Sequence, residues 1–149
     1  MEIRKATTED IPVLVEMGAE FAAYAPYPVE YSKDAASTFL RALIDGGIGV
    51  VFVGCEEGVI VAYLAGAVYP LWYAANTCVA GEIAWWVDPD YRTGGMAREL
   101  VRSFEGWAAD KGAAFVSISD INVSGEFSVG SYFTRLGYKT TERTHIKEV

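Results

Sequence analysis

The segment from Val87 to Ala97 constrains most strongly what this chain can fold into. It reads Val-Asp-Pro-Asp-Tyr-Arg-Thr-Gly-Gly-Met-Ala and joins an apolar, strand-like stretch to an amphipathic, helix-like one. A strand that ends at Val87, a turn, and a helix that begins near Gly95 would point several free backbone N–H groups at one place. Two adjacent glycines, Gly94 and Gly95, let a ligand approach the backbone closely. The segment therefore predicts an anion-binding site at the start of a helix.

Arg92 and the spacing that follows it narrow the kind of anion site. The guanidinium carries a permanent charge and a planar fork that suits phosphate oxygens. No Gly-Lys-Ser/Thr follows the glycines, and the Gly-x-Gly-x-x-Gly spacing of a dinucleotide fold is absent from this segment. The alternative interpretation is an ordinary strand-to-helix turn, in which the glycines only satisfy the backbone and Arg92 lies in solvent.

The pattern Arg-x-x-Gly-x-Ala, after Val-Asp-Pro-Asp-Tyr, resembles the coenzyme A signature of the GNAT superfamily of N-acetyltransferases. That signature is Gln/Arg-x-x-Gly-x-Gly/Ala after a strand that ends in Val-x-Pro. The resemblance implies that acetyl-CoA is the co-substrate and that the backbone of the loop holds its pyrophosphate. The residues matched to this role are Arg92, Thr93, Gly94, Gly95, Met96 and Ala97.

The resemblance also assigns a role to the strand that precedes the loop. In proteins similar to this one, the pantetheine arm pairs with that strand like an extra strand. Val87 would supply backbone contacts, and a backbone N–H near Trp86 or Val87 would polarise the thioester carbonyl. Trp85 and Trp86 are adjacent, so they should lie on opposite faces of the strand.

Size and charge bound the class of protein. With 149 residues, of which 52% are hydrophobic, the chain can bury a core, and we expect a single domain over residues 1–149. The net charge of −8 disfavours nucleic acid as a partner and favours cations. The N-terminus enters a structured pattern at once, without a secretory signal, so we expect a cytoplasmic protein that does not bind a membrane.

The cysteines and the histidine do not indicate a metal site. Cys55 and Cys78 lie far apart, and His145 is the only histidine, so the spacing of a zinc site is missing. We expect no metal. Both cysteines are interpreted as small apolar residues rather than nucleophiles.

Hydrophobic periodicity and turn signals predict ten elements in the order βααβββαβαβ. The predicted strands are residues 3–6, 50–55, 59–69, 82–87, 114–119 and 138–146. The predicted helices begin at Thr7 or Thr8, after Ser32, near Gly95 and at Phe127; they end before 25–28, at Gly46-Gly47, at Lys111-Gly112 and at Leu136. A loop is expected over 70–77.

This order indicates an α+β fold with a mixed sheet. It is also the order expected of the GNAT fold. The resemblance therefore covers nearly the whole chain and implies a mixed, mostly antiparallel, twisted sheet of six to seven strands flanked by about four helices.

Glu82 is the candidate general base. It opens the strand that leads into the loop, ten positions before Arg92, which resembles the placement of the catalytic glutamate in some family members. Burial at a strand end would raise the pKa of its carboxyl toward the working pH. The alternative is a solvent-facing glutamate at the start of a strand.

Tyr132 is the candidate general acid. Many relatives use a tyrosine four residues before the glycine of a Tyr-x-x-Leu-Gly-Phe-like segment, but here Phe133 occupies that position and Tyr132 lies one residue earlier. One residue is a rotation of about 100° on a helix. The alternatives are a structural tyrosine that packs its ring in the core, and water as the acid.

The resemblance implies an acyltransferase that moves an acetyl group from acetyl-CoA to a primary amine of a small molecule or peptide by direct attack in a ternary complex. Candidates for the acceptor pocket lie in loops: Tyr27, Trp72, Asp120 and Asn122. The alternative is a non-catalytic module that binds CoA or a regulatory partner. The aromatic loop around Trp72 is also a candidate interface for a homodimer.

Overall fold

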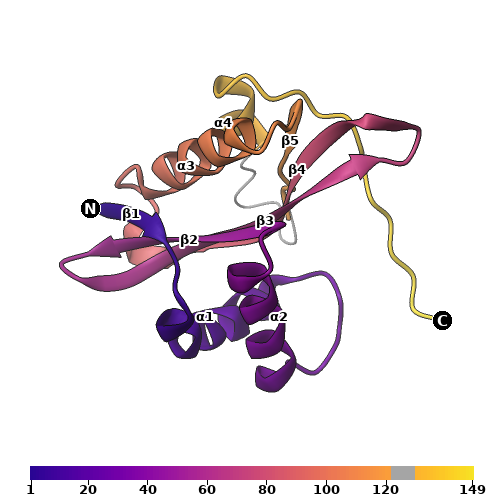
Figure 1. Cartoon of the computed structure of the whole chain (residues 1–149). Coiled ribbons are helices and arrows are strands. Elements are labelled where there is room, and N and C mark those ends of the chain that lie inside the picture. Colours follow the sequence, from indigo (N-terminus) through magenta and orange to yellow (C-terminus); the bar gives the residue numbers. More distant parts are fainter. Residues whose placement is uncertain (122–129) are drawn as a thin grey trace.

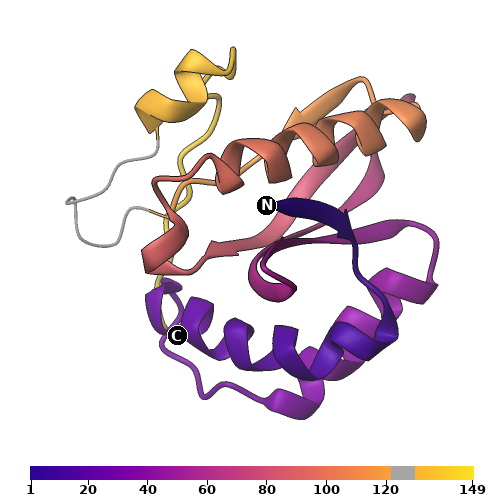
Figure 2. The same cartoon turned by 90° about the vertical axis from the view of Figure 1, so that its left-hand side faces the viewer.

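The computed structural model describes residues 1–121 and 130–149, and it contains one mixed sheet between two layers of helices (Figures 1 and 2). The strands lie across the sheet in the order β1-β2-β3-β4-β5. Neighbours from β1 to β4 are antiparallel, and β5 runs parallel to β4. Their bounds are Glu2–Lys5 for β1, Gly49–Glu56 for β2, Val59–Leu71 for β3, Ala74–Val87 for β4 and Phe115–Ser117 for β5.

The helices divide between the two faces of the sheet (Figure 1). One face is covered by α1 (Ile11–Tyr24) and α2 (Lys33–Asp45), and the other by α3 (Met96–Asp110) and α4 (Gly130–Arg135). No helix in the described parts of the chain combines the length and apolar character needed to cross a bilayer. The predicted α+β fold is confirmed, with five strands in the described residues rather than six to seven.

α2 begins after Ser32 as predicted, whereas the helix expected from Thr7 or Thr8 starts as a 3₁₀ helix, Thr8–Asp10, and becomes α1 only at Ile11. The Ser32 hydroxyl accepts the backbone N–H of Ala35 at 3.2 Å and so caps α2. Before α1, the Asp10 carboxylate accepts the N–H of Thr7 at 2.8 Å and a guanidinium N–H of Arg4 at 2.7 Å. The bond from Arg4 is the main reason that the pKa of Asp10 is lowered to about 2. This ion pair ties β1 to the start of α1.

The prediction of a loop over residues 70–77 is wrong. β3 and β4 continue as a two-stranded ribbon to a turn at Trp72 and Tyr73, with Pro70 opposite Cys78. The β2 partner of β3 ends at Gly49, so the missing N–H of Pro70 falls on a free edge of β3, where proline is tolerated. Both aromatics at the tip are exposed, Trp72 by 93%.

The C-terminal part of the chain also differs from expectation. The strand expected over 138–146 is wrong, because the structure has no regular element after Arg135. Residues 139–149 are all exposed, and a segment that buries so few side chains gains little from joining a sheet. Of the helix expected over 127–136, residues 130–135 form α4, and 127–129 lie outside the described residues.

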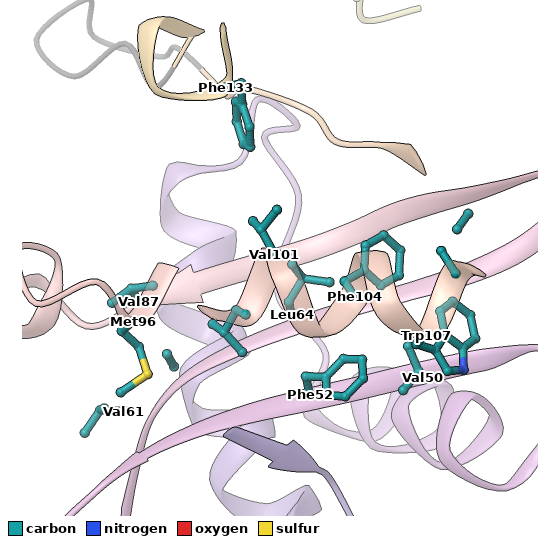
Figure 3. Packing of buried hydrophobic residues seen from close by; sticks show 14 residues of the cluster. Val50, Phe52, Val61, Leu64, Val87, Met96, Val101, Phe104, Trp107 and Phe133 are labelled. Carbon is teal, nitrogen blue, oxygen red and sulfur yellow. The ribbon is translucent and has the colours of Figure 1, made fainter. Parts of the chain in front are cut away.

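Each face of the sheet has its own buried core. The core under α3 is the one drawn in Figure 3. Trp85 packs on that core, whereas Trp86 is buried in the core under α1 and α2, which confirms the opposite placement predicted for the two rings. The largest fully buried side chains are Phe104, Leu14, Leu64, Leu100, Val51, Val53 and Val101.

Gly66 of β3 allows α3 to pack directly on the sheet. A Cβ at this position would lie 2.5 Å from the ring of Phe104 and 2.7 Å from the carbonyl oxygen of Gly81. Neither group can move freely, because Phe104 is fully buried and the carbonyl belongs to β4.

We expect Gly66→Ala to lower the free energy of unfolding by about 1–3 kcal/mol, the usual range for overpacking a core. Gly106→Ala is the matched control. A Cβ at Gly106, on the exposed side of α3, meets nothing within 4 Å, so alanine should stabilise the helix by about 1 kcal/mol. Urea unfolding followed by circular dichroism measures both changes. Equal stability of the two variants would contradict the tight packing of α3 on Gly66.

Candidate active site

The C-terminal end of β4 leads into α3 through a short turn. A 3₁₀ helix, Pro89–Tyr91, follows Asp88, and Gly95, with φ 85° and ψ −3°, is the N-cap that precedes α3. The first turn of α3 carries no side-chain cap among the described residues. Its N–H groups, at Met96 and Ala97, therefore have no partner of that kind and can receive an anion. We call the segment Arg92–Ala97 the cradle.

The two glycines of the cradle have different roles. Gly95 has a positive φ that side chains rarely adopt, so glycine is required there for the backbone. Gly94 has no such requirement, and a Cβ there would meet only the carbonyl oxygen of Tyr91, at 3.8 Å. Its contribution is an open surface beside the start of α3.

Met96 anchors the cradle to the sheet. Its side chain is 2% exposed, and its sulfur lies against Gly54 of β2, at the place where a Cβ on that glycine would project. The first turn of α3 is therefore held by core packing (Figure 3). The same residue contributes its backbone N–H to the cradle and its side chain to the core.

β4 has an open edge beside the cradle. β5 pairs with β4 at Val79, Ala80 and Gly81, and no described strand pairs with residues 82–87 on that side. Residues 82–87 therefore have no strand partner on that side, and an extended ligand can add there like a strand.

The alternation of backbone groups shows which amides face the open edge. The N–H of Asp88 donates to the carbonyl of Val61 on β3 at 2.9 Å. Because alternate residues of an antiparallel strand face the same neighbour, the amide of Trp86 faces β3, and those of Trp85 and Val87 face the open edge. Of the two amides considered for polarising a carbonyl, only that of Val87 is directed outward.

Glu82 lies where β5 diverges from β4. Ala84 and Glu82 face Ala65 and Gly66, so Ile83 is an extra residue that makes a bulge in β4. The half-buried carboxylate of Glu82 accepts the backbone N–H of Ser119 at 3.1 Å.

The burial of Glu82 has an electrostatic consequence. Desolvation raises the pKa of the carboxyl to about 7, and the hydrogen bond from Ser119 opposes this only partly. A carboxyl with that pKa exchanges protons near neutral pH, as a general base must.

Tyr132 and Phe133 of α4 point to different surroundings. Phe133 is buried, with its ring centroid 5.7 Å from that of Trp85 and 5.5 Å from that of Tyr138. The hydroxyl of Tyr132 is buried and has no hydrogen-bond partner in the described structure. Burial also raises the pKa of Tyr132, so its proton is retained at neutral pH.

The residues expected to line the acceptor pocket do not come together. Tyr27 is 56% exposed in the loop after α1. Trp72 lies at the tip of the β3–β4 ribbon, at the opposite end of β4 from the cradle, so the structure separates it from this site (Figure 1). Asp120 is exposed beyond β5, and Asn122 lies outside the described residues.

The structure contains a cluster around Trp86 that the sequence did not predict. The ring centroid of Tyr24, at the end of α1, lies 5.1 Å from that of Trp86, and the guanidinium carbon of Arg92 lies 4.8 Å from the same ring. Arg92 also donates its Nε–H to the carbonyl of Val87 at 2.9 Å. No local pattern could have found a contact between residues 62 positions apart.

The described residues contain no group of three or more histidine, cysteine or acidic side chains suited to a metal ion. Cys55 is buried and Cys78 is half-buried, and neither is in a disulfide.

Comparisons with known proteins identify a family for this chain and solved structures with a similar fold. The model of the Acetyltransferase (GNAT) family matches residues 16–138. A predicted acetyltransferase from Clostridium acetobutylicum, solved with acetyl-CoA, is 14% identical with a TM-score of 0.79, covering 99% of this chain and 95% of that chain. No match was found among curated proteins.

Two aminoglycoside acetyltransferases are also similar in structure. AAC(6')-IG from Acinetobacter haemolyticus is 16% identical, with a TM-score of 0.78, over 100% of this chain and 98% of that chain. AAC(6')-Iy, in complex with the bisubstrate analog CoA-S-monomethyl-acetylneamine, is 15% identical, with a TM-score of 0.80, over 99% and 97%. At these identities the likeness is one of fold.

Proposed function

The chain belongs to the acetyltransferase (GNAT) family, and from that premise we propose that it transfers an acetyl group from acetyl-CoA to a primary amine by direct attack in a ternary complex. The observation that carries the proposal is the uncapped start of α3 beside the open edge of β4. A diphosphate fits the first feature, and an extended amide-bearing arm fits the second.

The residues proposed to hold acetyl-CoA follow from these two features. The backbone of Thr93, Gly94, Gly95, Met96 and Ala97, at the uncapped start of α3, is proposed to hold the diphosphate. The outward amide of Val87 is the proposed donor to the thioester carbonyl, where negative charge develops during attack. Acetyl-CoA supplies the acetyl group as an activated thioester.

Glu82 is proposed as the general base. Its carboxylate takes a proton from the acceptor ammonium, directly or through one water, so that the amine is neutral when it attacks. The raised pKa of Glu82, about 7, supports this role, because a carboxyl of ordinary pKa would be a much weaker base.

Tyr132 is proposed as the general acid. Its buried hydroxyl keeps its proton and lacks a hydrogen-bond partner in the described structure, a state that costs free energy unless a ligand atom completes it. The proton would pass to the sulfur that leaves the acetyl group. Water as the acid remains the alternative.

The acceptor is proposed to be an amine of a small molecule or peptide. The acidic chain would attract an ammonium group, and structurally similar proteins include aminoglycoside acetyltransferases. Tyr27 and Asp120 stay as proposed contacts, because Tyr27 follows Tyr24, which packs on Trp86, and Asp120 follows Ser119, whose amide donates to Glu82. We propose a cytoplasmic protein without nucleic-acid or membrane partners.

A second candidate function is a module that binds CoA without transferring the acetyl group. It is favoured by Phe133, which occupies the position where many relatives have a tyrosine and is buried in the core. Calorimetry with CoA, followed by thiol release with a panel of amines, separates the two functions. Binding without release on any amine favours the module, and no binding defeats both.

We expect Gly94→Asp to weaken CoA binding about tenfold, because a carboxylate beside the cradle repels the diphosphate. The same charge near the start of α3 should stabilise the helix slightly, so loss of binding cannot be ascribed to unfolding. Gly94→Asn, of nearly equal size and neutral, is the matched control and should bind CoA almost normally. Isothermal titration calorimetry measures both. Equal affinities would place the diphosphate elsewhere.

The rate at saturating substrates should rise with pH and level off above about pH 7, because the Glu82 carboxyl must lose its proton before it can accept one. Glu82→Gln should remove this rise and lower kcat about 100-fold. Thiol release measured from pH 5.5 to 9 provides the profile. An unchanged profile in the variant would exclude Glu82 from proton transfer.

Tyr132→Phe should lower kcat about 100-fold and change the affinity for CoA far less, since only the hydroxyl is removed. Tyr138→Phe is the matched control, because its hydroxyl donates to Glu105 at 2.8 Å rather than lacking a partner. Its kcat should change little. Full activity of the Tyr132 variant would assign the proton to water.

A further inference from the structure

We infer that Arg92 is a positioning residue rather than a phosphate ligand: it holds the last peptide of β4 and, through Trp86, joins the cradle to the end of α1. The inference rests on the proposed function, because it concerns the same donor site. It departs from the interpretation of Arg92 as a fork for phosphate oxygens, which its place in the motif first suggested.

The guanidinium of Arg92 is held by one hydrogen bond and one ring contact. Its Nε–H donates to the carbonyl of Val87 at 2.9 Å, and its carbon lies 4.8 Å from the centroid of the Trp86 ring. A cation over an indole face is attracted by the ring quadrupole. These two contacts hold the guanidinium in position.

Trp86 is itself held from two sides. Its Nε1–H donates to the carboxylate of Asp88 at 3.1 Å, and its ring packs against Tyr24 with centroids 5.1 Å apart. Only 7% of Trp86 is exposed. Side chains from α1, β4 and the turn before the cradle therefore form one cluster, which comprises Tyr24, Trp86, Asp88 and Arg92.

The cluster lies on the side of the sheet away from α3. Trp86 belongs to the core under α1 and α2, whereas α3 covers the opposite face (Figure 1). A diphosphate on the first turn of α3 is bound by backbone N–H groups of that helix. Arg92 is held toward the other face by its stacking on Trp86.

The contact of Arg92 with the carbonyl of Val87 affects the open edge of β4. Val87 faces the open edge with both its N–H and its C=O. The carbonyl accepts the Nε–H of Arg92, and this hydrogen bond fixes its direction. It thereby also fixes the end of the β4 edge with which a pantetheine arm would pair. Lysine has no equivalent of the Nε–H and planar fork, so it cannot reproduce both contacts.

The test compares two ligands on the same variant. CoA and 3′-phospho-ADP share the nucleotide and its diphosphate, but only CoA carries the pantetheine arm. We expect Arg92→Lys to weaken CoA about tenfold, the loss of one charge-assisted hydrogen bond, and to change the affinity for 3′-phospho-ADP less than twofold. Calorimetry gives both affinities without any turnover.

Trp86→Leu is a second test variant, because this buried side chain cannot touch a phosphate. It should show the same selective loss of CoA affinity, and the double variant should lose little more than either single one. Parallel losses for both ligands in Arg92→Lys, or no loss for either, would overturn the positioning role. If Trp86→Leu does not fold, the Arg92→Lys comparison decides alone.

The outcomes also separate this inference from the proposed function. A wild-type protein that binds neither ligand would defeat the proposed function. Normal wild-type binding of CoA, combined with parallel losses in the variant, would defeat only the role of Arg92.

Discussion

The divergence of β5 from β4 after Gly81 is the constraint on which the rest of the site depends. Backbone N–H and C=O groups require partners, and along residues 82–87 the described sheet supplies them on one side only. This unsatisfied edge is what an extended ligand can complete. Glu82 lies where the two strands separate, and its carboxylate accepts the amide of Ser119 from the segment after β5.

The edge is useful only because the elements around it are rigid. Gly66 lets Phe104 of α3 lie directly on β3, and Gly54 makes room for the sulfur of Met96, so the start of α3 is set by close packing. The uncapped N–H groups of the cradle are thereby held beside the end of β4. Binding of the proposed co-substrate there would require little ordering of the protein.

The cluster around Trp86 extends this rigidity to the other face of the sheet. Arg92 belongs to the motif through its place in the sequence, yet its contacts are with a carbonyl and an indole ring. One arginine thus connects the last peptide of β4 with the end of α1. The motif identifies the residue, but its partners are determined by which face of β4 carries Trp86.

Local patterns in the sequence determined the cradle, the cap at Ser32 and the opposite faces of Trp85 and Trp86, because each depends on backbone geometry within a few residues. They misjudged 70–77 and 138–146, where strand formation depends on a neighbouring edge. Only the tertiary structure decided the pKa of Glu82, the unpartnered hydroxyl of Tyr132 and the contacts of Arg92. Burial and long-range contact arise when distant segments pack, and no local spacing encodes them.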